Sequence, residues 1–121
     1  MIVEDHPDQS EPLARFLQKC GHDTRCYPNG REALSALMQE KCDCVILDLL
    51  MPEMDGPTFL ETIRSYLRLR AIPVIVLSAL RDSLLLDKVR GQNVNAVLLK
   101  GSTTFEEIKR ALDEAVKPLT H

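Results

Sequence analysis

Five polar side chains in this sequence each follow a short apolar run. They are the carboxylates of Glu4, Asp5 and Asp48, the hydroxyl of Ser78 and the amine of Lys100. The preceding runs consist mainly of Val, Ile and Leu, and the loop after Asp48 contains Pro52 and Gly56. Such runs are typical of strands buried on both faces of a sheet. Each polar group is therefore expected where a buried strand leaves the core.

Together these groups could hold a cation and a phosphoryl group. Carboxylates gathered in one place repel one another unless a cation is present, and oxygen ligands without thiolate or imidazole favour Mg²⁺. Lys100 would add a positive charge, and Ser78 a hydrogen-bond donor, opposite the metal, which suits a phosphoryl group. A carboxylate nucleophile can form an aspartyl phosphate. Asp48 is the candidate because it lies centrally between the acid pair and the Ser78–Lys100 side.

The elements that must position these groups alternate along the whole chain. Strands are predicted near residues 2–3, 24–27, 44–48, 74–77 and 96–99, with a helix after each. This alternation predicts an α/β fold, in which a five-stranded parallel sheet carries helices on both faces. We expect the flavodoxin-like (βα)5 arrangement with strand order 2-1-3-4-5. The carboxyl ends of the strands then share one edge, so topology alone brings the five polar groups together.

Capping residues and apolar stripes predict where the helices begin and end. Polar residues at the start of an apolar stripe are typical of helix starts, and Gly of helix ends. The apolar stripe of the helix after Asp48 is predicted to extend to Leu67, and that of the last helix to Leu119. Three successive leucines at residues 84–86 cannot all face one way on a helix, so at least one should point outward. The predicted boundary residues are Gly21, Asn29 with Glu32, Asp55, Asp82, and Thr103 with Glu106.

The composition favours one globular domain covering residues 1–121. Hydrophobic residues make up 45% and aromatic residues only 4%, so aliphatic side chains must fill the core. The net charge is −3 and Lys and Arg form no run, which gives no sign of direct nucleic-acid binding. No apolar stretch approaches the ~20 residues of a membrane span, and the first residues do not form a signal peptide. We therefore expect a cytoplasmic protein without membrane contact.

The cysteines form no metal or redox motif. No pair has C-x-x-C spacing, and the histidines do not fall at zinc-ligand spacing. Free cysteine behaves as a small hydrophobic side chain. We expect reduced, mostly buried thiols at Cys20, Cys26, Cys42 and Cys44.

Four segments together resemble a known family. They are VED (residues 3–5), VILDLLMPEMDG (residues 45–56), PVIVLSA (residues 73–79) and Lys100. Their spacing and order are similar to those of the receiver domains of response regulators in two-component signalling, and the likeness covers nearly all of the chain. Each segment alone is a weak signal, and the combination is a strong one.

The resemblance implies a role for each site residue. Asp48 would accept a phosphoryl group from a sensor histidine kinase or a phosphotransfer protein. Asp5 would bind Mg²⁺ directly, Glu4 mainly through water, and the backbone carbonyl of Leu50 would be a further ligand. Ser78 and Lys100 would contact the phosphoryl oxygens. The domain would accept phosphoryl groups without being an enzyme in its own right, beyond slow loss of its own phosphate.

Three positions depart from the family pattern. Val97 stands where an aromatic residue is usual, Gly101 where proline usually follows the lysine, and Asn93-Val94 where Gly-Ala is common. These changes leave the phosphorylation chemistry in place and put the usual output switch in doubt. We expect the fourth helix, the fifth strand and the fifth helix to form the face for a homodimer or an effector, with residues 82–90 as its responsive part.

Three other functions compete with this interpretation. A pseudo-receiver would act as an interaction module without phosphorylation, and the departures at Val97 and Gly101 keep it open. A Mg²⁺-dependent phosphatase usually has a second acid two residues after its nucleophile, where this chain has Leu50. A flavin-binding protein of this fold is disfavoured because the anionic loop of residues 4–8 would repel a phosphate.

Overall fold

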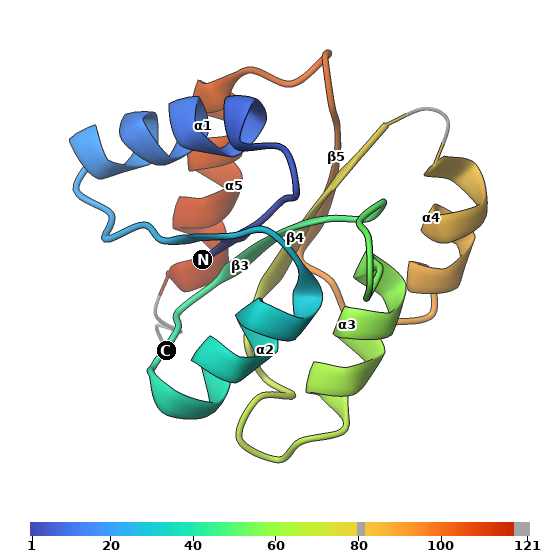
Figure 1. Cartoon of the computed structure of the whole chain (residues 1–121). Helices are drawn as coiled ribbons and strands as arrows, with labels where there is room; N and C mark the ends of the chain where they lie inside the picture. The colour runs from blue at the N-terminus through green and yellow to red at the C-terminus, as the bar shows by residue number, and fades with distance from the viewer. Residues whose placement is uncertain (80–81, 118–121) are drawn as a thin grey trace.

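The computed structural model describes residues 1–79 and 82–117 as one parallel sheet with helices on both faces (Figure 1). The strand order is β2-β1-β3-β4-β5, which confirms the predicted α/β fold and the predicted order 2-1-3-4-5. The elements in chain order are β1 (Ile2–Val3), α1 (Pro7–Lys19), β2 (Cys26–Tyr27), α2 (Gly30–Gln39), β3 (Val45–Asp48), α3 (Gly56–Arg64), β4 (Val74–Ser78), α4 (Ser83–Val89), β5 (Ala96–Leu99) and α5 (Phe105–Val116).

The strand register sets the carboxyl ends side by side. Val3 pairs with Leu47, Asp48 with Leu77, and Ser78 with Leu99. The backbone N–H of Lys100 donates to the Ser78 carbonyl at 2.9 Å and so continues the ladder past the end of β5. The residues that end or follow β1, β3, β4 and β5 therefore lie along one edge of the sheet.

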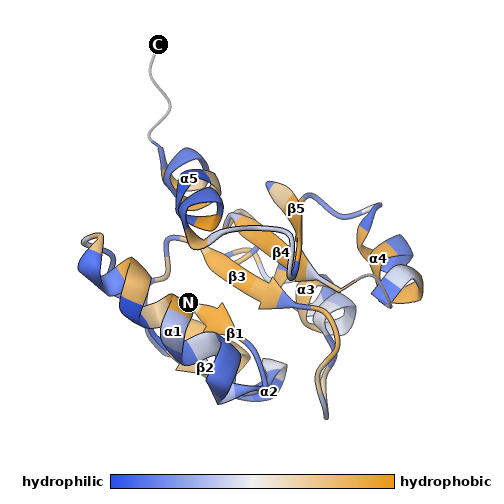
Figure 2. Ribbon diagram, turned by 90° about the horizontal axis from the view of Figure 1, so that it is seen from above, coloured by the Kyte–Doolittle hydropathy of each residue, from blue (hydrophilic) through white to orange (hydrophobic). Residues whose placement is uncertain are grey.

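Two apolar layers enclose the sheet, because successive strand residues point to opposite faces. On one face, Val45 and Leu47 of β3 pack with α2, α3 and α4, and Phe59 of α3 is completely buried there. On the other face, Ile46 packs with α1 and α5. The strands form the apolar centre of the molecule in Figure 2, and the polar sides of the helices face outward. No helix in the described residues is both long and apolar enough to cross a bilayer.

Three predicted helix starts, at Asn29, Asp55 and Asp82, are confirmed, and one is shifted. The side chains of Asn29 and Asp55 accept backbone hydrogen bonds at the starts of α2 and α3. The capping box of α5 is formed by Thr104 and Glu107, not by Thr103 and Glu106 as predicted. The hydroxyl of Thr103 instead donates to the Leu99 carbonyl at 2.8 Å, so this residue closes the preceding turn.

The predicted stripe on α3 was too long. The helix ends at Arg64, whose guanidinium donates to the carbonyls of Arg70, Ile72 and Asn93 and so holds the chain as it turns back. Leu67 consequently lies beyond the helix and is 78% exposed.

The burial predicted for the three successive leucines is confirmed, whereas that predicted for the cysteines is not. Among the three successive leucines Leu84 is 79% exposed, as expected for at least one of them. The prediction of mostly buried thiols was wrong, because only Cys44 is buried, and Cys20 and Cys26 are exposed. These two lie at the end of α1 and on the outermost strand β2, where a small side chain is left uncovered. Leu119, predicted for the stripe of α5, lies outside the described residues.

Candidate functional site

The predicted site residues meet at the carboxyl edge of the sheet. Asp48 ends β3 and Ser78 ends β4, while Glu4 follows β1 and Lys100 follows β5 by one residue. Glu4, Asp48 and Ser78 are buried, and Lys100 and Asp5 are partly exposed. The central strand thus presents Asp48, 4% exposed, at the middle of the edge.

Lys100 links the acids from different strands into one cluster. Its Nζ lies 2.6 Å from Oε1 of Glu4 and 2.8 Å from Oδ1 of Asp48. It also donates to Oε1 of Gln9 on α1 at 3.1 Å. The sequence reasoning missed Gln9. The only available signal was its place in the first turn of the helix that begins just after Asp5.

Burial and the neighbouring charges set the protonation of these groups. Burial above all, with the nearby charge of Glu4, raises the pKa of Asp48 to about 7 against the opposing effect of Lys100. Burial also acts to raise the pKa of Glu4, but the hydrogen bond and charge of Lys100 outweigh it and hold that pKa below its ordinary value. Burial tends to lower the pKa of Lys100, but its bonds to Asp48 and Glu4 raise it overall. Lys100 is therefore a fixed positive charge, and Asp48 is the carboxylate least stabilised in its ionised form.

Asp5 offers a free oxygen toward the loop after β1. Its Oδ1 is buried and accepts no hydrogen bond from the described residues, although Nδ1 of His6 lies 3.1 Å away. Burial, followed by a hydrogen bond with Glu4, raises the pKa of Asp5. One ligand atom from each of Glu4, Asp5 and His6 lies within 4.8 Å of the others. An unsatisfied carboxylate oxygen beside a second carboxylate fits a hard divalent cation.

His6 is exposed and contacts both acids of the pair. Its side chain is 52% exposed and its Nδ1 lies 3.3 Å from Oε2 of Glu4.

Ser78 lies on the same edge, but its hydroxyl is bonded within its own loop. It donates to the Ala79 carbonyl at 3.1 Å. The Ala79 N–H donates to Oδ2 of Asp82 at 2.9 Å, and the Asp82 N–H donates back to the Ala79 carbonyl at 3.0 Å. Asp82, the residue before α4, is buried. The Ser78 hydroxyl is therefore bonded toward the start of α4 and not to the ammonium of Lys100.

The loops around the site show why certain residue types are needed there. Gly101 has φ of +83°, which the fixed ring of proline cannot adopt, so the chain after Lys100 follows a path closed to proline. A Cβ on Gly56 would lie 2.7 Å from Cα of Leu49 and 2.8 Å from the carbonyl oxygen of Asp48. The start of α3 thus packs directly on the backbone at the end of β3. Leu50, two residues after Asp48, is 48% exposed.

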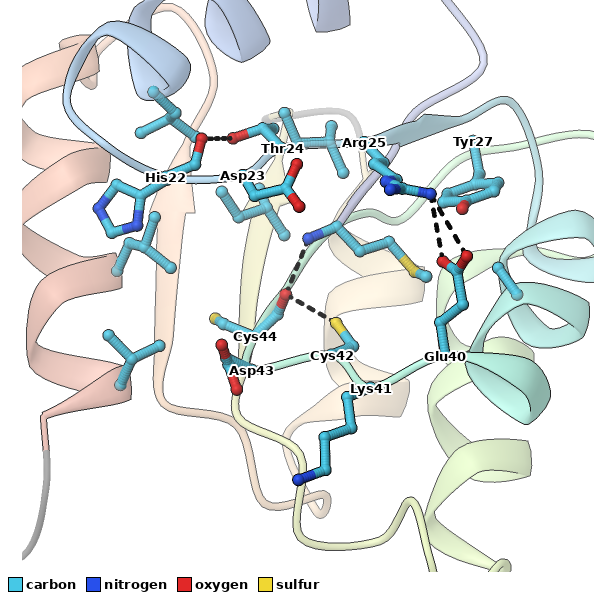
Figure 3. Close-up of a pocket in the computed structure, with 17 residues that line it drawn as sticks. His22, Asp23, Thr24, Arg25, Tyr27, Glu40, Lys41, Cys42, Asp43 and Cys44 are labelled. Atoms are coloured by element: carbon cyan, nitrogen blue, oxygen red, sulfur yellow. Dashed lines mark hydrogen bonds and ion pairs between the residues drawn. The ribbon is translucent and has the colours of Figure 1, made fainter.

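Two cavities lie at opposite edges of the sheet. One, of about 450 Å³, reaches from Glu4, Asp48 and Lys100 down between α1, α5 and the sheet, where Leu13 and Ile108 line it. The other, of about 360 Å³, surrounds the start of β1, where the amino group of Met1 donates to the Cys44 carbonyl at 3.0 Å (Figure 3). None of the predicted site residues lines the second cavity.

Comparison with known proteins gives one consistent result. The family model for the response regulator receiver domain matches residues 1–113. The chain is 32% identical to the transcriptional regulatory protein GltR of Pseudomonas aeruginosa over 79% of its own length and 39% of the relative's. It is 35% identical to the sensor histidine kinase TmoS of Ectopseudomonas mendocina over 88% of its own length and 11% of the relative's. The chain therefore spans well under half of the curated relatives that it matches.

Solved structures share the fold. A signal receiver domain of a histidine kinase from Syntrophus aciditrophicus superposes with a TM-score of 0.87 at 32% identity, covering 95% of this chain and 86% of that one. The receiver domain of the sensor histidine kinase PA1611 from Pseudomonas aeruginosa has a TM-score of 0.87 at 22% identity, covering 97% and 95%. That structure has a magnesium ion coordinated in its active site cleft.

Proposed function

The chain belongs to the response regulator receiver domain family, and we propose that Asp48 takes a phosphoryl group from a histidine kinase or a phosphotransfer protein. The observation that carries this proposal is the position of Lys100. Its ammonium lies 2.8 Å from one oxygen of the buried Asp48 carboxylate and can neutralise the charge that gathers there. No other acid in the described cluster combines this burial with a central position on the edge.

The proposed reaction joins an Asp48 oxygen to phosphorus while the bond from phosphorus to the donor nitrogen breaks. The donor imidazole leaves with the electron pair of that bond and takes up a proton. Lys100 stabilises the phosphoryl oxygens, and the Ser78 hydroxyl can turn from the Ala79 carbonyl to donate to one of them. The apolar neighbours of Asp48 exclude water from the new acyl phosphate.

We propose that the acid pair supports this step by holding Mg²⁺. Asp5, Asp48 and the backbone carbonyl of Leu50 would be direct ligands, and Glu4 would act mainly through water. The unbonded oxygen of Asp5 supports this assignment, as does the magnesium in the cleft of the PA1611 receiver domain. The ion would offset the repulsion between the phosphoryl group and the carboxylates.

The relatives support the proposed partners. One is a sensor histidine kinase and another a transcriptional regulator, and in each the matched part is a fraction of the protein. We expect this domain to work in the cytoplasm, where kinases take their phosphoryl groups from ATP. It would accept and slowly lose phosphate, without turnover of a separate substrate.

The direct test is labelling of Asp48. Incubation with Mg²⁺ and a small phosphodonor should add one phosphoryl group that is stable in acid and labile in base. Asp48→Asn should abolish the label, while Asp55→Asn, at the start of α3, should retain it as a matched control. Undiminished labelling of Asp48→Asn would refute the assignment.

We further propose that phosphorylation is passed on through α4 to the face formed by α4, β5 and α5, which would meet a second copy or an effector. The bonds from Ser78 to Ala79 and from Ala79 to Asp82 support this route, because a hydroxyl drawn to the phosphoryl group would release the peptide that positions Asp82. Val97 is too stiff a side chain to follow as an aromatic ring would.

Amide exchange with and without a beryllofluoride mimic tests this route. We expect the largest changes at residues 79 and 82–90, with smaller ones on α5. Changes confined to the loop after Asp48 would reject the route and favour a pseudo-receiver that binds partners without this switch.

A further inference from the structure

Lys100 has as many acceptors around it as it has hydrogens to donate. An ammonium carries three donors, and its acceptors here are Glu4 at 2.6 Å, Asp48 at 2.8 Å and Gln9 at 3.1 Å. The two carboxylates come from β1 and β3 and the amide from α1. The ammonium is therefore held from three directions by groups far apart in sequence.

Gln9 differs from the other two acceptors because the proposed reaction does not require it to change partners. The proposed reaction uses Glu4 for the metal and consumes an oxygen of Asp48, so both carboxylates change partners during phosphorylation. Gln9 lies outside the acid set and is neutral. Its amide oxygen can hold the ammonium without cancelling the positive charge that the phosphoryl group needs.

The backbone around Lys100 leaves its side chain to be positioned by contacts with other elements. The Lys100 N–H is fixed on the Ser78 carbonyl, but the next residue is Gly101, with φ of +83°, and β5 has only one neighbouring strand. A lysine side chain on an edge strand loses considerable conformational entropy when it is held in one place. The backbone of Gln9 is fixed in the first turn of α1, where its N–H donates to the His6 carbonyl at 3.0 Å, and its exposed side chain accepts from Lys100 from that position.

We propose that Gln9 is the positioning residue that keeps the Lys100 ammonium over Asp48 while Glu4 and Asp48 exchange partners. This inference rests on the proposed function. It assigns to α1 a share in the phosphorylation step, in addition to its packing on the sheet. The effect acts through Lys100, since Gln9 itself does not touch Asp48 in the contacts of the described residues.

The first test is a double-mutant cycle on the labelling rate. Gln9→Met has similar size and no strong acceptor, and should slow labelling of Asp48 by a small phosphodonor about five-fold, the value of one modest hydrogen bond. In a Lys100→Ala background the same change should have no further effect. Gln39→Met, at the exposed end of α2, is the matched control and should label at the wild-type rate. An equal loss from Gln9→Met with and without Lys100 would overturn the proposal.

The second test needs no phosphorylation and separates this inference from the proposed function. In metal-free protein, ¹³C relaxation of the Lys100 Cε methylene should show a more mobile side chain in Gln9→Met than in wild type. Gln9→Glu should restore the order parameter of this methylene, and Gln39→Met should match wild type. An unchanged order parameter in Gln9→Met would overturn the proposal that Gln9 positions Lys100. If Asp48 takes no label in wild type but the order parameter does fall in Gln9→Met, the proposed function is wrong and the positioning of Lys100 by Gln9 is still supported.

Discussion

The acid side and the lysine side of the site are supported in different ways. Asp48 extends from β3, which has a strand on each side and is buried along its length. Lys100 follows β5, which has one neighbouring strand and leaves Val97 46% exposed. The acid is thus placed by backbone pairing and core packing, whereas the ammonium is placed by side-chain contacts from other elements.

This contrast predicts that substitutions on the two sides of the site have different kinds of effect. Substitutions among the acids should change what the site can bind, because the positions of those residues are fixed and only their charge is altered. Substitutions around Lys100 and the adjoining loops should change how fast or how long the site is occupied. Three measurements can break or sharpen this distinction.

The largest effect is expected for the metal on the acid side. Asp5→Asn should weaken Mg²⁺ binding about a hundred-fold or more, because loss of an outer-shell partner of a metal ligand alone typically costs about ten- to a hundred-fold and Asp5 would be a direct ligand. Glu4→Gln should weaken it less, because Glu4 is already bonded to Lys100 and would act mainly through water. Calorimetric titration measures both.

Asp8→Asn, an exposed acid in the first turn of α1, is the control and should bind as wild type. No loss in either site variant would contradict the metal site. A larger loss in Glu4→Gln would reverse the assigned roles.

An intermediate effect is expected on stability without metal. The pKa of Asp48 is raised from 3.8 to about 7, so the folded state holds this proton more tightly than the unfolded state does. Its contribution to stability is present below about pH 4 and is lost as the pH rises towards 7. The full shift corresponds to at most about 4 kcal/mol, and we expect about 2 kcal/mol because Lys100 and Glu4 readjust.

The measurement is urea unfolding in a chelator at pH 4.5 and pH 8. Asp48→Asn should be more stable than wild type at pH 8 by about 2 kcal/mol, and nearly equal to it at pH 4.5. The same difference at both pH values would show that burial of the Asp48 charge is not its cause.

The smallest effect is expected from Leu50, two residues after the proposed acceptor Asp48. Its apolar side chain can exclude water but cannot orient it, and it is half-exposed. Leu50→Asn should shorten the half-life of the phosphorylated protein roughly three-fold, and Leu50→Met should leave it unchanged. Leu80, which follows Ser78 by two residues as Leu50 follows Asp48, lies outside the described ranges, and Leu80→Glu is predicted to act in the same direction. Unchanged half-lives in both polar variants would show that exclusion of water by these leucines does not limit hydrolysis.

The sequence predicted the fold and the gathering of the site because both follow from topology. Runs of Val, Ile and Leu marked the strands, and a parallel sheet must bring Glu4, Asp48, Ser78 and Lys100 to one edge. The roles of these residues in phosphoryl transfer remain predictions, as does the single domain over residues 1–121.

The details that escaped prediction depend on side-chain contacts between distant segments. The bond from Gln9 to Lys100 spans 91 positions. The choice between Thr103 and Thr104 as the cap of α5 was decided by the Leu99 carbonyl, which takes the hydroxyl of Thr103. Leu67 is exposed because α3 ends at Arg64, whose guanidinium donates to three carbonyls of other segments. The spacing of apolar residues in the sequence contains no information about these bonds.

Gly56 shows how far the requirements of Asp48 extend beyond the reacting groups. Because a Cβ there would meet the backbone of Asp48 and Leu49 at less than 3 Å, any side chain at this position must push the end of β3 away from the start of α3. A saturation mutagenesis screen for phosphorylation would therefore rank Gly56 next to Asp48 in intolerance to replacement. Read without the structure, such a screen would assign a chemical role to a residue that has no functional group and whose contribution is the absence of a side chain.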